Sequence, residues 1–233
     1  MPRLRLLLTT ALLGAASLHC AFPVGSRARP AEAMAKDRIA VGAGGLVPLG
    51  FVGQLDFPGD DKEATDVSQA DVGDFVPVGS FDWAIGDGEY AGVDISYTKF
   101  GAGYFDLVVI NPRFEYPFGG KDRNFSLTFD ANFMYANGNN EDFSFAAPFM
   151  QPMMGVRYYL DLYHVGFVIS QSIGTSIISF YAPGGISIDV PIRFGEGLPT
   201  LHFMPEFRWD PTIFVAVARF VMFSAGGVVM LEF

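Results

Sequence analysis

Charged side chains inside otherwise apolar stretches are the residues best suited to chemistry in this 233-residue sequence. Arg193 is flanked by Ile192 and Phe194, and the same alternation of charged and apolar residues recurs elsewhere. Successive side chains of a β-strand point to opposite faces, so each of these charges would share a face with other polar residues. The candidates are Arg113, Glu115, Asp130, Arg157, Asp189, Arg193, His202, Glu206 and Arg208.

We do not expect these residues to catalyse a reaction. Beyond residue 20 the histidines are His164, in a predicted turn, and His202, which shares a strand with Glu206 but with no serine. A Ser-His-Asp constellation therefore has no visible basis. Gly42 to Gly45 lack the spacing of a phosphate-binding loop, and a single cysteine, Cys20, excludes disulfides and cysteine-based zinc sites. We predict no enzyme activity, no cofactor and no metal site.

The elements that must position these charges are strands, because apolar residues recur with a period of two from residue 39 onward. Phe125, Phe129 and Phe133, for example, fall on one face of a strand and Asp130 on the other. Turn-forming residues such as Gly86-Asp87-Gly88 and Asp210-Pro211 separate the stretches. The expected strands are 39–57, 73–86, 90–100, 104–118, 124–137, 143–160, 164–180, 185–195, 200–210 and 212–233.

A barrel in a membrane explains this pattern better than a soluble barrel does. The apolar, aromatic faces run over lengths near the ~9–11 residues that a tilted strand needs to cross a bilayer. Charges in the middle of strands would be costly inside a soluble barrel but are normal on the inner face of a membrane barrel. The predicted fold is all-β, a single closed antiparallel transmembrane β-barrel of about ten strands, with 8–12 as the allowed range.

Two features leave alternatives open. Residues 212–231 are almost continuously apolar and could form a transmembrane helix, although Gly226-Gly227 and the β-branched residues favour a strand, or two strands with a turn at these glycines. Prolines such as Pro48 and Pro205 fall inside expected strands, where they would have to occupy bulges or strand ends.

The N-terminus has the features of an export signal. Arg3 and Arg5 precede an apolar stretch that ends in small residues and is too short to span a bilayer. We predict a signal peptide over 1–20, a polar linker over 21–38 and the barrel over 39–233. Cleavage fits either Ala15-Ala16-Ser17 or Ala31-Glu32-Ala33, and lipidation of Cys20 is a third route.

The C-terminus ends in Phe233 with Leu231 and Val229 at alternate positions before it. This ending resembles the sorting signal of small bacterial outer-membrane β-barrels of the OmpX and OmpW type. The resemblance implies location in the bacterial outer membrane, recognition by the barrel assembly machinery, and contact with outer-membrane lipid and lipopolysaccharide.

The net charge and the charged segments limit the classes of function further. The formal net charge is -10, which argues against nucleic acid as a partner. The segment 56–74 is strongly acidic and could bind cations or a partner, or could be only a solvated loop. Four inward arginines face four inward acids, so they could pair into a closed lumen or line a channel. We expect a structural or narrow-channel, porin-like barrel for small solutes, with a surface-binding barrel as the alternative and a lipid-acting enzyme as a weaker one.

Overall fold

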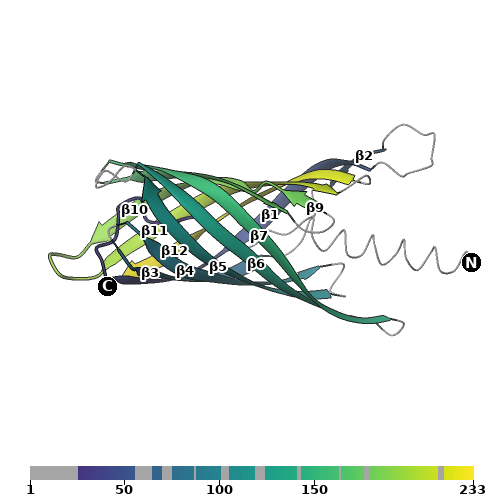
Figure 1. The fold of residues 1–233 in the computed structure, drawn as a ribbon, viewed down its shortest axis with the longest axis horizontal. Coiled ribbons are helices and arrows are strands. Elements are labelled where there is room, and N and C mark those ends of the chain that lie inside the picture. Colours follow the sequence, from purple (N-terminus) through teal and green to yellow (C-terminus); the bar gives the residue numbers. More distant parts are fainter. Residues whose placement is uncertain are drawn as a thin grey trace, which may run out of the picture.

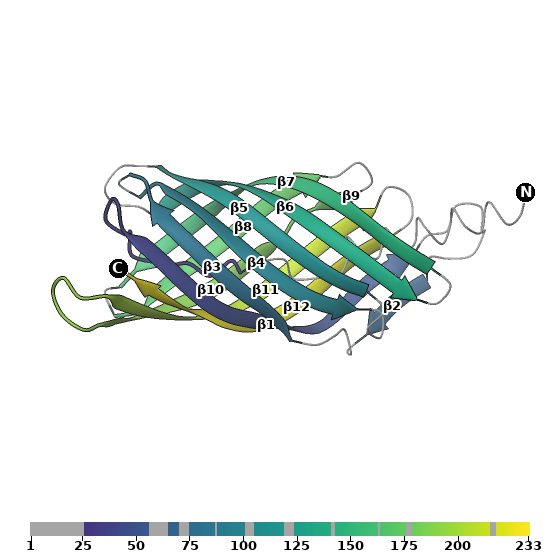
Figure 2. The ribbon, with the colours of Figure 1, turned by 90° about the horizontal axis from the view of Figure 1, so that it is seen from below.

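The computed structural model describes residues 26–55, 65–69, 75–86, 88–100, 105–118, 124–140, 143–162, 164–175, 179–214 and 218–233. Long strands make up most of this part of the chain and tilt around a common axis (Figures 1 and 2). In chain order they are β1 (Ile39–Leu55), β2 (Thr65–Gln69), β3 (Val76–Ala84), β4 (Tyr90–Phe100), β5 (Phe105–Phe118), β6 (Phe125–Asn140), β7 (Phe143–Asp161), β8 (Gly166–Thr175), β9 (Ser179–Tyr181), β10 (Gly184–Arg193), β11 (Thr200–Phe214) and β12 (Ala218–Glu232).

These strands close into one antiparallel barrel. Apart from the short strands β2 and β9, neighbours in the chain pair with each other, and β12 pairs with β1 from Ala40↔Glu232 to Leu55↔Ala218. The two short strands share positions with longer ones. β2 and β3 pair with successive parts of the same edge of β1, and β9 and β10 lie end to end between β8 and β11. The described strands therefore occupy ten positions around the barrel, which confirms the predicted closed barrel of about ten strands.

The last two strands correct the sequence reading. β11 continues through the expected turn at Asp210-Pro211, where Asp210 pairs with Met222 and Pro211 with Val221. Proline is tolerated here because Pro211 lies opposite the break between β9 and β10, and its carbonyl accepts a hydrogen bond from the Ala182 amide at 2.9 Å.

The helical alternative for 212–231 is wrong, since β11 and β12 cover its described residues. No described helix is long and apolar enough to span a membrane. The suggested turn at Gly226-Gly227 is also wrong, because both glycines lie within β12 and pair with β1. Pro48, by contrast, lies at a bulge in β1, where the register with β12 shifts between Pro48 and Gly50.

The polarity of the barrel is reversed relative to a soluble protein. Along β3, buried and exposed residues alternate strictly, with Ser80 and Asp82 buried and Phe81 and Trp83 exposed. The described side chains of the other long strands repeat this arrangement, so the outer surface that they form is apolar and the interior is largely polar. Large outward side chains include Ile110, Phe114, Phe129, Tyr158, Ile169, Ile186, Phe203 and Phe207.

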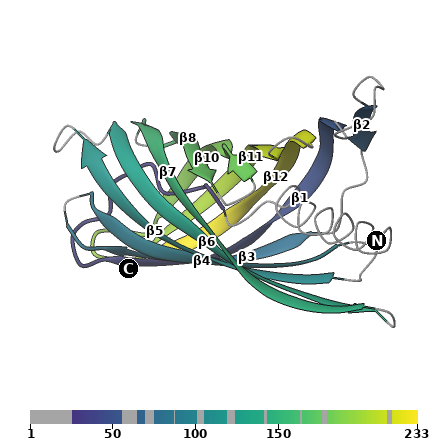
Figure 3. The same cartoon turned by 45° about the vertical axis from the view of Figure 1, so that its right-hand side comes forward.

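The interior also contains a stretch of the N-terminus, residues 26–34, which we call the inner segment. Ala28 and Met34 belong to a buried cluster with Tyr90, Met204 and Met230 of the wall. Figure 3 shows this purple stretch between the walls of the barrel. Its last residue, Met34, lies near the end of the barrel where β1 begins and β12 ends, which we call the terminal mouth.

Candidate functional site in the barrel lumen

The inner wall carries far more acidic than basic side chains. Among the described residues, the buried wall carboxylates outnumber the buried wall arginines, so the balance of four arginines and four acids expected from sequence does not hold. Asp82 and Asp94 were missed, although each alternates with apolar neighbours like the predicted residues. The carboxylates are Asp82, Asp94, Glu115, Asp130, Asp189, Glu206, Asp210 and Glu232, and the arginines are Arg113, Arg157 and Arg208.

Eight of the nine predicted site residues are buried on this inner wall: Arg113, Glu115, Asp130, Arg157, Asp189, His202, Glu206 and Arg208. Arg193 differs. It lies on the same face of β10 but at the terminal mouth, where it is exposed and forms an ion pair with Glu32. The alternation predicted the correct face for Arg193. Because β10 ends at this residue, the Arg193 side chain lies at the rim of the barrel and not in the lumen.

One group of charges joins β3, β4 and β5. Arg113 contacts Asp82 and lies 2.7 Å from Asp94 Oδ1 through its Nη1 atom. Ser80 donates a hydrogen bond to the same oxygen of Asp94 at 2.7 Å. On the neighbouring stretch of wall, Arg157 and the Tyr159 hydroxyl both contact Glu115. Such pairing is what makes buried charges tolerable.

A second group lies across β9, β10, β11 and β12. Arg208 contacts Asp210 at 2.7 Å, and the Tyr181 hydroxyl donates to the same carboxylate at 2.8 Å. Nearer the terminal mouth, His202 lies between two carboxylates. Its Nδ1 is 2.9 Å from Asp189 Oδ1 and its Nε2 is 3.3 Å from Glu232 Oε2.

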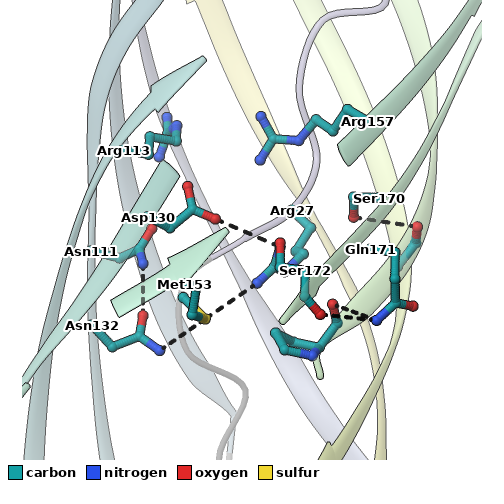
Figure 4. A network of polar contacts seen from close by, with 12 residues as sticks. Arg27, Asn111, Arg113, Asp130, Asn132, Met153, Arg157, Ser170, Gln171 and Ser172 are labelled. Carbon is teal, nitrogen blue, oxygen red and sulfur yellow. Dashed lines mark hydrogen bonds and ion pairs between the residues drawn. The ribbon is translucent and has the colours of Figure 1, made fainter. Parts of the chain in front are cut away.

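The inner segment adds two buried arginines that sequence reasoning also missed. Arg29 lies between the two acids of β3 and β4, with Nη2 2.7 Å from Asp94 Oδ2 and Nε 3.6 Å from Asp82 Oδ2. Arg27 donates to Ser172 Oγ at 2.6 Å and lies 3.8 Å from Asp130 Oδ2 (Figure 4). Each arginine therefore faces carboxylates of the wall.

The wall also binds the backbone of the inner segment. Glu206 accepts hydrogen bonds from the amides of Arg27 at 2.7 Å and Ala28 at 3.3 Å, as well as from the Ser26 hydroxyl. Closer to the terminal mouth, Asp189 accepts from the Ala31 amide at 2.7 Å. The Met34 amide donates to the Tyr90 hydroxyl, also at 2.7 Å. Acidic wall residues thus hold the segment from the terminal mouth to the level of Glu206.

The remaining predicted features lie elsewhere. The acidic segment 56–74 is outside the described residues except for the backbone of β2. Val229 is exposed on the outward face of β12, Leu231 is partly exposed on the same face, and Phe233, just after the end of β12, is exposed. Within the part of the chain that the structure describes, no group of three or more His, Cys, Asp or Glu side chains could hold a metal ion.

Comparisons with known proteins find similarity in fold only. No protein-family model and no curated protein matches the sequence. The β domain of the Bordetella autotransporter BrkA is 11% identical, with 84% of this chain and 99% of that chain covered at a TM-score of 0.38. The N-terminal β-barrel domain of Pseudomonas aeruginosa OprF is 9% identical, with 86% and 100% covered at 0.35. A Pseudomonas aeruginosa FadL homologue is 7% identical, with 84% and 89% covered at 0.32. These neighbours are bacterial outer-membrane β-barrels, and the likeness assigns no family.

Proposed function

We propose that this chain is an integral β-barrel of the bacterial outer membrane that forms a narrow path for small solutes, closed in this state by the inner segment. One observation supports it above all: the barrel is apolar outside and charged inside. Phe129 is 46% exposed on the outer face, whereas Arg208 is completely buried inside. A large apolar outer surface is favourable against lipid and unfavourable against water.

The polar lumen supports the channel part of this proposal. Several buried wall hydroxyls have no hydrogen-bond partner among the described residues, so they could bind water or a polar solute once the inner segment is displaced. They are Ser126, Thr128, Ser187, Thr212 and Ser224. A ten-strand barrel is narrow, so the path would admit only small solutes even without the inner segment.

Ion conductance across a planar bilayer tests the proposal. The refolded protein is compared with the Glu206→Ala and Arg193→Ala variants. Glu206 holds three donors of the inner segment, so its loss should release the segment and increase the time spent open. Arg193 pairs at the rim with Glu32 of the inner segment, a single contact, so its loss should increase the time spent open less than the loss of Glu206 does. Folded, inserted protein that remains silent in all three forms would contradict a channel.

A structural or surface-binding barrel without conductance is the second candidate. The occupied lumen favours it, because the inner segment contacts the wall from the terminal mouth to Glu206. Its proposed partners are outer-membrane lipid, lipopolysaccharide and the barrel assembly machinery, as for barrels of the OmpX and OmpW type. Deletion of residues 58–72 in the acidic segment would then remove surface binding without changing lumen behaviour.

We also propose that the barrel is not an enzyme. Both ring nitrogens of His202 contact carboxylates, Asp189 and Glu232, so neither is directed at a hydroxyl or thiol nucleophile. Incubation of the folded protein with phospholipid and lipopolysaccharide, followed by mass spectrometry of the lipids, should reveal no product. A new lipid product that disappears in His202→Ala would contradict this expectation.

A further inference from the structure

We propose that Arg27 and Arg29 occupy two cation-binding sites of the lumen wall, and that displacement of the inner segment opens a cation-selective path that binds guanidinium-bearing solutes. This inference rests on the proposed channel function and adds the class of solute to it. The inner segment is then a displaceable ligand supplied by the chain itself.

Charge is the first support for this inference. Among the described buried residues, the wall alone has eight carboxylates and three arginines, an excess of five acids (8 − 3 = 5). Arg27 and Arg29 reduce this excess to three (5 − 2 = 3). Without them, the lumen would present a strongly negative interior with low-dielectric walls, which concentrates cations and repels anions.

The geometry of the two sites specifies the kind of cation. Arg29 donates to Asp94 and lies beside Asp82, and the same two carboxylates also hold Arg113. A planar guanidinium with several fixed donors suits paired carboxylate acceptors better than a spherical ion does. The Arg29 site therefore selects by shape as well as by charge.

The Arg27 site is built less tightly and retains unused binding capacity. Arg27 Nη1 donates to Ser172 and is 3.8 Å from Asp130 Oδ2, while Oδ1 of Asp130 is buried with no hydrogen-bond partner among the described residues. A buried carboxylate oxygen without a partner is unfavourable, and a cation with another donor would satisfy it. A free guanidinium, unconstrained by a chain, can take the position that pairs both oxygens.

The test uses the full chain with the Arg27→Ala/Arg29→Ala double variant in planar bilayers under a KCl gradient. Lys36→Ala is the matched control, since Lys36 is an exposed cation just outside the inner segment. We expect the open probability of the double variant to rise by more than about tenfold over the unaltered protein. The reversal potential should move toward the K⁺ equilibrium value, and the control should behave like the unaltered protein.

Addition of guanidinium ion then probes the vacated sites. Guanidinium should reduce the K⁺ current of the double variant, whereas the same concentration of Na⁺ should not. An open variant that passes K⁺ and Cl⁻ equally, or that ignores guanidinium, would overturn this inference and leave the channel proposal standing.

The inner segment could remain in the lumen even without its two arginines. A second variant that displaces the segment by a different means covers this case. Gly166→Leu keeps both arginines and pushes on the inner segment, because a Cβ at Gly166 would lie 2.0 Å from the Ala31 Cβ. It should open the same cation-selective path. Silence of both variants, in protein shown to be folded and inserted, would overturn the inference and the channel proposal together.

Discussion

Gly166 is a wall residue at which an added side chain would collide with the inner segment. A Cβ there would be 2.0 Å from Ala31 Cβ, while its nearest wall neighbour, Asp189 Cβ, would remain at an ordinary 3.5 Å. Leucine at this position should therefore expel the segment without disturbing the strand pairing of β8. Overpacking of this kind typically costs about 1–3 kcal/mol, enough to raise the displaced population by roughly fivefold to a hundredfold.

Thiol labelling can measure that displacement. Ala28, which is completely buried, is replaced by cysteine in a Cys20→Ser background and treated with a bulky maleimide. Gly166→Leu should speed the labelling by about fivefold or more. Gly79→Leu is the control, because a Cβ at Gly79 meets nothing within 4 Å. Equal labelling rates in the two glycine variants would show that the inner segment is not in contact with Gly166.

At the scale of elements, the closure between β1 and β12 depends on glycines. A Cβ at Gly226 would lie 2.0 Å from the Gly45 carbonyl oxygen, and one at Gly44 would lie 2.0 Å from that of Gly227. Both collisions involve backbone, which cannot move aside without opening the ladder. Gly226→Val should lower the free energy of unfolding by about 1–3 kcal/mol or more.

Urea unfolding in detergent micelles, followed by tryptophan fluorescence, measures this change. Gly79→Val provides a strand glycine with open space around it and should leave the midpoint nearly unchanged. A Gly226→Val midpoint equal to that of the control would mean that the closing strands can separate locally without loss of stability.

The strands were predictable because each carries its own signal. In β6, alternation of polar and apolar residues specifies both the extended backbone and the two faces, and no partner strand needs to be known. The end of β11 was not predictable in this way. Asp210-Pro211 has the composition of a turn, but the break between β9 and β10 opposite Pro211 makes an amide donor unnecessary there. The break is a property of the neighbouring strands, and no residue of β11 signals it.

At the scale of the whole molecule, the outer surface predicts a depth-dependent response to charge. Ile110 lies near the middle of β5 and is 44% exposed, and Phe118 lies at its end. Arginine at the middle of a lipid-facing strand costs about 2–4 kcal/mol, and near the interface about 0–1 kcal/mol. Ile110→Arg should therefore destabilise the barrel much more than Phe118→Arg does, as measured by reversible unfolding in lipid vesicles. Equal effects of the two variants would argue against burial of β5 in a bilayer.

The position of the inner segment in the lumen could not be predicted from sequence, because it depends on residues from many strands at once. Residues 26–34 have no strand or helix period, and they were assigned to a polar linker over 21–38. Their burial follows from the excess of carboxylates on the opposing wall, which becomes visible only when inward residues of all strands are summed. Asp82 and Asp94 could have entered that sum, since they alternate with apolar neighbours as clearly as Asp130 does.

The same excess of acids bears on the position of the predicted signal-peptide cleavage. Cleavage after Ala33 would detach Arg27 and Arg29 from the barrel, which would leave Asp130 without Arg27 and leave Asp82 and Asp94 with Arg113 alone. Cleavage upstream of Ser26 keeps these contacts within one chain, where the inner segment rebinds at high effective concentration. We therefore expect the intact mass of protein purified from outer membranes to include residues 26–34. A mature N-terminus at residue 34 would mean that the lumen is freed of its arginines by processing, and such protein should then conduct cations without any of the variants described above.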